Sequence, residues 1–170
     1  MAGKGRIGIR ETVLFGVLGA LTFSLKLAMA FLPNIEPVSL MLMVFAVVFG
    51  WKALYITYVY VAMEILFFGL SLWNIYYLYV WAVLVFAAIL LRGMKSPLGW
   101  AVLSGAFGLM FGALCALTDL FIGGPGYALA KWITGITFDL THCIGNFAVA
   151  LLMFGPLRTL LDNLYQRVRK

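Results

Sequence analysis

The residues of this chain that could do chemistry are ionisable and polar side chains set inside long apolar stretches. One face of the stretch 128–154 carries four such positions, separated by four, three and four residues: Gly135, Asp139, His142 and Asn146. That spacing places them in one stripe along an α-helix. Asp139 and His142 both titrate and lie one turn apart, so at membrane depth they need either water or a partner. The pattern favours a functional role for this pair.

Two further stretches present polar side chains interleaved with aromatic ones at helical spacing. The stretch 53–71 aligns Thr57, Tyr60, Glu64 and Phe67 or Phe68, and the start of 75–91 aligns Asn74, Tyr77 and Trp81. This mixture is typical of a small-molecule site. The predicted substrate-binding residues are Lys26, Asn34, Glu36, Glu64, Trp73, Asn74, Tyr77, Trp81, Asp139, His142 and Asn146.

Several of these residues have a purely structural interpretation as well. Lys26 and Glu64 either neutralise each other as an ion pair or contact a ligand, and the sequence leaves both open. Aromatic residues 73, 76 and 77 lie where an interfacial belt is expected, and for Tyr76 the belt alone is the favoured interpretation. For Asp119 and Lys131 a solvated helix end is favoured over ligand contact.

Catalytic signatures are missing from the sequence. The chain has one histidine, which excludes histidine-pair metal motifs, and it contains neither Gly-x-Ser-x-Gly nor His-Glu-x-x-His. Cys143 follows His142 directly and therefore points ~100° away from the stripe. We accordingly predict no catalytic residue, no metal ligand and no cofactor, and we expect a protein that is not an enzyme.

Composition identifies the elements that must hold these residues. Of the 170 residues, 65% are hydrophobic and only 11% are charged, more apolar than a soluble domain of this size requires. Six apolar stretches follow one another, at about 11–31, 38–50, 53–71, 75–91, 99–122 and 128–154. These predict an all-α integral membrane protein with six transmembrane helices in a single transmembrane domain, 1–170. The stretch 38–50 is short, so it is either tilted or a buried helix that crosses only partly.

The basic residues predict the orientation. Ten of the twelve lie on one side when the connections are numbered alternately: Lys4, Arg6, Arg10, Lys52, Arg92, Lys95, Arg158, Arg167, Arg169 and Lys170. By the positive-inside rule both termini are cytoplasmic, in a multi-pass protein of the bacterial plasma membrane. The charge surplus is then a topology signal, so no nucleic-acid partner is expected. The buried ionisable residues fall in the outer leaflet, which predicts a pocket open to the outside.

The first helix also carries a stripe of small residues. Gly16, Ala20, Ser24 and Ala28 recur every four positions and form a groove that another helix could approach closely. The partner is either a docking protein or an internal helix of the same chain. Lys26 lies ~200° around the helix from Ser24 and therefore faces away from the groove.

With six helices, cytoplasmic termini and an outward pocket, the chain resembles the substrate-capture subunits (S-components) of energy-coupling factor vitamin transporters. The resemblance covers nearly the whole chain, and it includes Leu32-Pro-Asn-Ile-Glu-Pro-Val-Ser-Leu40 and Phe138-Asp-Leu-Thr-His-Cys-Ile-Gly-Asn146. The family's first-helix motif is Ala-x-x-x-Ala, and this chain has Ala20-x-x-x-Ser24-x-x-x-Ala28.

The resemblance implies tight binding of a vitamin or cofactor precursor by a chain without an ATPase of its own. It implies docking through the first helix on a transmembrane scaffold subunit that carries two ATPase subunits, and toppling in the membrane to release the cargo inside. The loops 33–37 and 72–74 would cap the ligand. Acidic groups outnumber basic ones in the pocket by four to two, which favours a cation or a neutral amide-rich or heteroaromatic cargo.

Two other function classes fit the same residues. A proton-coupled secondary transporter of a small polar solute would use Asp139, His142 and Glu64 as a proton relay. A membrane assembly factor would transport nothing. The classes differ in their energy source, since only an energy-coupling importer needs partner ATPases.

Overall fold

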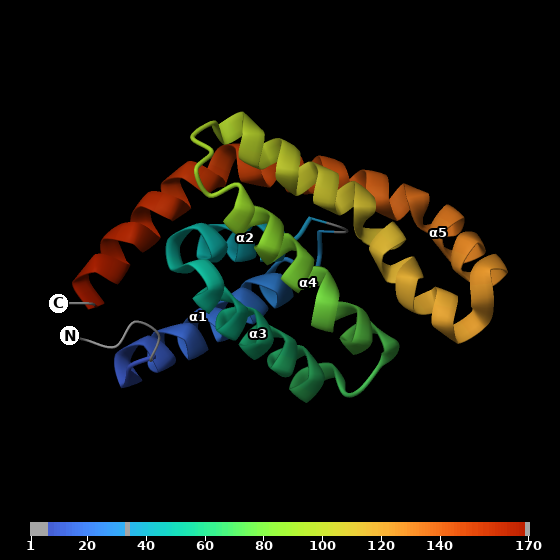
Figure 1. Ribbon diagram of the computed structural model, residues 1–170, viewed down its shortest axis with the longest axis horizontal. Helices are drawn as coiled ribbons and strands as arrows, with labels where there is room; N and C mark the ends of the chain where they lie inside the picture. Colours follow the sequence, from blue (N-terminus) through green and yellow to red (C-terminus); the bar gives the residue numbers. More distant parts are fainter. Residues whose placement is uncertain (1–6, 33–34, 169–170) are drawn as a thin grey trace.

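The structure is a computed structural model that describes residues 7–32 and 35–168 (Figure 1). Its elements in chain order are α1 (Ile9–Ala28), α2 (Val38–Phe49), the short 3-10 helix η1 (Gly50–Lys52), α3 (Ala53–Phe68), α4 (Leu72–Leu90) and α5 (Pro97–Val168). All regular secondary structure in these ranges is helical, so the predicted all-α class is confirmed.

The element α5 is two helices joined at a sharp reversal. Gly124 has φ 77° and ψ −179°, a backbone conformation that only glycine adopts without strain. The first arm, 97–123, and the second arm, 125–168, therefore run back alongside each other, and Figure 1 shows the reversal at the right-hand end of the molecule. A Cβ on Gly108 would lie 2.8 Å from the backbone of His142, so the two arms touch backbone to backbone.

The centre of the bundle is α2. Nearly all of its residues are buried, and it packs against α1, α3, α4 and α5. Its 12 residues rise only ~18 Å, well short of the ~30 Å hydrocarbon layer. The stretch 38–50 is thus a short helix enclosed by its neighbours.

Several helix ends differ from the predicted limits. The first helix ends at Ala28 rather than at residue 31, and α3 ends at Phe68 because Gly69 takes φ 80°. The α4 helix begins early, at Leu72, because Ser71 and Asn74 form a capping box. The last helix does not end at residue 154: it continues through Pro156 to Val168. Leu157, Leu161 and Tyr165, spaced four apart, pack this extension onto the core.

The start of α1 and the end of α5 lie at the same end of the bundle, on the left in Figure 1. Glu11 in α1 forms an ion pair with Lys52 at 2.7 Å and accepts a hydrogen bond from the hydroxyl of Tyr165. The ring of Tyr165 also packs edge-on against Phe49, with centroids 4.8 Å apart. We call this contact of α1, η1 and the second arm the terminal junction.

Much of the outer surface of the bundle is apolar. Within the described residues, four helical runs are long and apolar enough to cross a membrane: Ile9–Ala28, Val38–Phe68, Leu72–Leu90 and Pro97–Arg167. Large apolar side chains project outward from them, among them Val13 at 60% exposure, Phe121 at 89% and Ile144 at 69%. A surface of this kind is favourable only in contact with an apolar medium. The second and fourth runs each contain a break, at η1 and at Gly124.

Candidate functional site

A cavity of about 660 Å³ lies where the connection between α1 and α2 meets the start of α4 and both arms of α5. We call it the larger cavity. Its lining combines charged, aromatic and aliphatic side chains: Lys26, Met29, Ala30, Leu32, Ile35, Glu36, Phe68, Ser71, Trp73, Tyr77, Phe111, Phe138 and His142. This volume falls in the range of small-molecule sites in proteins.

Lys26 enters the larger cavity from the last turn of α1. Its Nζ lies 2.8 Å from Oε1 of Glu64 on α3 and 3.4 Å from the hydroxyl of Tyr77 on α4. The same ammonium lies 5.2 Å from the ring centroid of Tyr77 and 5.8 Å from that of Phe68, within cation–π range. Glu64 is buried, whereas the Lys26 side chain is 22% exposed. Both sequence interpretations of Lys26 are therefore compatible with its position, since it forms the ion pair and also lines the cavity.

A second charged contact lies across the cavity. Glu36, just before α2, places Oε1 3.4 Å from Nε2 of His142 on the second arm of α5. The pair is close enough for an ion contact, but the two groups are not aligned as a hydrogen bond. His142 is buried and lies between the rings of Phe111 and Phe138, at centroid distances of 5.1 and 5.6 Å. The cavity therefore offers polar groups on two sides and flat apolar surfaces between them.

A smaller cavity of about 280 Å³ lies beside the first, between α4 and the two arms of α5. Trp73, Phe111 and Phe138 line both cavities and form the wall between them. The other lining residues of the smaller cavity are Tyr76, Gly112, Cys115, Asp119, Lys131, Trp132, Thr134, Gly135 and Asp139.

Three lining residues of the smaller cavity form a hydrogen-bonded group. The hydroxyl of Tyr76 donates to Oδ1 of Asp119 at 2.6 Å, and Nζ of Lys131 lies 3.5 Å from the same oxygen. Asp119 and Tyr76 are both only 3% exposed. The predictions of a solvated helix end for Asp119 and of a simple aromatic belt for Tyr76 were therefore wrong. They failed because each residue is covered by a partner from a different helix.

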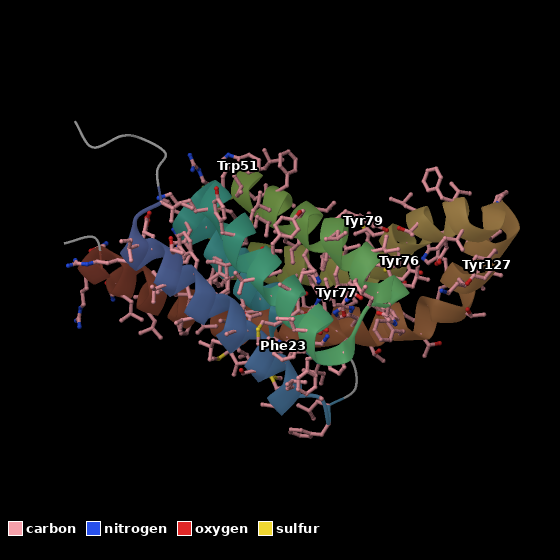
Figure 2. The ribbon with its side chains drawn as sticks, turned by 90° about the horizontal axis from the view of Figure 1, so that it is seen from below. Phe23, Trp51, Tyr76, Tyr77, Tyr79 and Tyr127 are labelled. Atoms are coloured by element: carbon pink, nitrogen blue, oxygen red, sulfur yellow. The ribbon has the colours of Figure 1, made fainter. Side chains whose placement is uncertain are left out.

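Consecutive tyrosines of α4 thus serve the two cavities. Tyr77 contacts Lys26 in the larger cavity and Tyr76 contacts Asp119 in the smaller one. In Figure 2, Tyr77 lies on the side of Phe23 in α1, and Tyr76 lies on the side of Tyr127, just past the reversal of α5. Adjacent helical residues point ~100° apart, which lets one turn of α4 face both sites.

The stripe predicted on the last helix is divided between three environments. Gly135 and Asp139 line the smaller cavity, and His142 lines the larger one. Asn146 lies deeper in the bundle, where its Nδ2 donates to Oγ of Ser39 at 3.1 Å. The stripe exists as predicted by helical spacing, but its members do not converge on a single pocket.

Other predicted site residues lie behind the cavity walls. Trp81 is fully buried in the aromatic core, 5.4 Å from the ring of Tyr77. Asn74 is occupied in capping α4, because its Oδ1 accepts the backbone N–H of Ser71 at 2.6 Å. Glu64 reaches the larger cavity only through Lys26, and Asn34 lies outside the described residues.

Two wall residues, Phe111 and Phe138, were missed by the sequence analysis. A signal was present, because Gly105, Gly108 and Gly112 repeat at spacings of three and four along the first arm. These glycines let the second arm approach, and the approach brings Phe111 and Phe138 into the shared wall.

The small-residue groove of α1 faces outward. A Cβ on Gly16 would have nothing within 4 Å, and Ser24 and Ala28 are exposed, whereas Ala20 is half-buried. The glycine that packs α1 against α3 is Gly19, whose Cβ would lie 2.6 Å from the side chain of Val59. Within the described residues, no internal helix therefore fills the predicted groove.

Comparisons with protein-family models, with curated proteins and with solved structures found no match to this chain. Among the residues that the structure describes, no group of three or more His, Cys, Asp or Glu side chains is placed to hold a metal ion. The arrangement supports noncovalent binding of a small molecule, by hydrogen bonds to charged groups and by stacking on aromatic rings.

Proposed function

We propose that this chain is the substrate-capture subunit of an energy-coupling factor importer for a vitamin or cofactor precursor. The observation that carries the proposal is the larger cavity, which combines the Lys26–Glu64 pair, the Glu36–His142 contact and five aromatic side chains at one end of an apolar bundle. The S-component resemblance of the sequence supports the same assignment.

The proposal includes six membrane crossings with both termini cytoplasmic. The four long apolar runs give six crossings if the second run is divided into α2 and α3 and the fourth into the two arms of α5. Lys52 and Arg10 lie at the end of the bundle with the terminal junction, and the larger cavity lies near the other end of α1. Under the positive-inside rule the cavity then faces outward, where cargo would enter.

The lining favours a flat, nitrogen-rich heteroaromatic cargo. Trp73, Tyr77, Phe111 and Phe138 offer stacking surfaces, and Lys26 supplies donors on one side of them. Glu36 supplies an acceptor on the other side. The one acid in the described lining, Glu36, lies beside His142, and Lys26 is already paired with Glu64 behind the wall, so a neutral or singly charged molecule suits the site better than a polyanion.

The outward groove of α1 is the proposed scaffold surface. It is open at Gly16 and Ser24, while Gly19 packs on α3 and Lys26 enters the cavity from other faces of the same helix. One helix can thus contact the cargo and a scaffold subunit at once. Close packing at small residues is a main source of helix association in lipid.

The test joins binding, docking and uptake. Mass spectrometry of the purified chain should identify a retained compound, and co-expression with a scaffold and two ATPase subunits should yield a complex. Ala20→Trp and Ser24→Trp should each abolish co-purification and uptake, while affinity of the isolated chain for the retained compound stays within about threefold, a change under ~1 kcal/mol.

Val102→Trp is the matched control, since it places the same side chain at an exposed apolar position of α5. It should leave docking intact. Loss of cargo affinity in the α1 variants, or equal loss of docking in the control, would contradict the assignment of the groove.

A proton-coupled secondary transporter is the alternative, and one observation favours it. Asp139 and His142 are buried one turn apart on the second arm, as a proton relay would require. Vesicles that contain this chain alone decide between the two. Uptake driven by a pH gradient would establish the alternative, whereas uptake only with the ATPase module and ATP would exclude it.

A further inference from the structure

The smaller cavity has a buried acceptor that the rest of the protein leaves unused. Asp139 is 2% exposed and lies in the wall of this cavity. Its Oδ1 accepts the backbone N–H of Gly112 at 3.0 Å, but its Oδ2 has no hydrogen-bond partner among the described residues. A buried carboxylate oxygen without a donor is costly, so it points to a group that the site receives from outside.

Gly112 makes the position of this carboxylate possible. A Cβ on residue 112 would lie 2.4 Å from Oδ2 of Asp139, so the space is there only because the residue is glycine. The carboxylate is therefore seated against the first arm of α5 and fixed by the backbone N–H of the same residue.

The charges of the cavity call for one more cation. Its described ionisable groups are Asp119, Asp139, Lys131, the hydroxyl of Tyr76 and the thiol of Cys115. Lys131 lies 3.5 Å from Asp119 and balances that acid, whereas Asp139 forms no ion pair with any described Lys, Arg or His. One monocation would neutralise the site.

The walls show which kind of cation fits. Trp73, Tyr76, Trp132, Phe111 and Phe138 supply aromatic surfaces, which attract organic ammonium groups and are poor ligands for metal ions. The volume of about 280 Å³ is many times the ~30 Å³ share of one water molecule, far more than a bare ion needs.

We propose that the smaller cavity binds a protonated amine, whose N–H groups donate to Oδ2 of Asp139 while its apolar part packs on the aromatic walls. This site is distinct from the larger cavity and does not depend on docking to a scaffold. Binding measured on the isolated chain therefore tests it separately from the importer function.

Benzylammonium and its neutral counterpart benzyl alcohol are suitable probes, titrated calorimetrically into the full chain in lipid nanodiscs. Benzylammonium should bind at least tenfold more tightly than benzyl alcohol. Asp139→Asn should lower its affinity at least tenfold, and Trp132→Leu at least threefold. Asp162→Asn, at a side chain that is 45% exposed beside Arg158, should leave the affinity within twofold.

Three results would overturn the assignment. The first is equal affinity for the two probes. The second is unchanged benzylammonium affinity in Trp132→Leu. This variant is expected to fold because the Trp132 side chain is 41% exposed, so it tests the site even if Asp139→Asn does not fold. The third is a greater loss of affinity in Glu36→Gln than in Asp139→Asn, which would move the amine to the larger cavity.

Discussion

Lys26 connects the stability of the bundle with the chemistry of its larger cavity. Its ammonium pairs with Glu64 at 2.8 Å, and Glu64 is only 5% exposed. A buried carboxylate left without its cation is strongly destabilising, whereas replacing both members by apolar groups is often neutral. The two roles of Lys26, ion pair and ligand contact, can therefore be separated experimentally.

Lys26→Met alone should lower the free energy of unfolding by about 3–5 kcal/mol, because it strands the charge of Glu64. Combined with Glu64→Leu, the loss should largely disappear. Thermal unfolding in a fixed detergent measures both. If the double variant is stable but binds the retained cargo at least tenfold more weakly, Lys26 also contacts cargo. A single variant as stable as the parent would show that the pair does not support the fold.

His142 and Asn146 lie one turn apart, and we expect loss of the first side chain to affect binding and loss of the second to affect stability. His142→Ala should weaken cargo binding at least tenfold, because the imidazole lines the larger cavity beside Glu36. Asn146→Ala should instead cost about 1–3 kcal/mol of stability, because it removes the buried partner of Ser39. Calorimetric titration and thermal unfolding of both variants separate the effects. Equal effects of the two variants on affinity would contradict this division.

At the scale of the helices, the contact between the two arms of α5 depends on Gly108. Gly108→Ala would place a methyl group 2.8 Å from the backbone of His142, which cannot move aside as a flexible side chain can. We expect a loss of about 1–3 kcal/mol in stability, together with weaker binding at the cavities that the arms enclose. Thermal unfolding and cargo titration measure the two effects.

Gly126→Ala is the matched control in the same element, because its Cβ would meet nothing within 4 Å. It should be neutral or stabilising by up to ~1 kcal/mol, since alanine favours a helix over glycine. Destabilisation of equal size at both positions would mean that flexibility, and not the close approach of the arms, is what glycine provides at residue 108.

Helical periodicity predicted which residues share a face but not which helices those faces meet. The spacing of Asp139, His142 and Asn146 was enough to place them in one stripe, because that relation is local to one helix. The partners of Asp119 and Asn146 come from α4 and α2, and such pairings depend on how the helices are arranged in space. The division of the stripe between two cavities and the interior of the bundle could not be derived from one helix alone.

The helix limits followed the same rule. Some helix ends depend on local backbone chemistry, at Gly69, Pro97 and the glycine pair at 123–124. The sequence analysis placed breaks close to these positions. The packing of the segment beyond Pro156 onto the core was not predicted, because it involves residues such as Phe49 that lie far away in the chain. The sequence pattern within a helix therefore predicts where that helix lies in the chain better than it predicts how the helices pack together.

At the scale of the whole molecule, the orientation in the membrane can be tested directly. The two native cysteines are first removed by Cys115→Ala and Cys143→Ala. Single cysteines are then placed at Lys95, just before the first arm of α5, and at Gly126, just after the reversal, which are opposite ends of that arm. Both positions are exposed and can therefore be labelled. A membrane-impermeant maleimide applied to intact cells should label Gly126→Cys and spare Lys95→Cys. Inverted vesicles should show the reverse. The opposite pattern would place the larger cavity on the cytoplasmic side.

The terminal junction has a consequence for biosynthesis. Tyr165 reaches back to Glu11 across a separation of 154 residues and packs on Phe49 at the end of α2. Translation proceeds from the N-terminus, so this junction stays open until residue 165 has been made. A nascent chain stalled before residue 165 lacks the hydroxyl that donates to Glu11 and the ring that packs on Phe49, although the ion pair of Glu11 with Lys52 can already form.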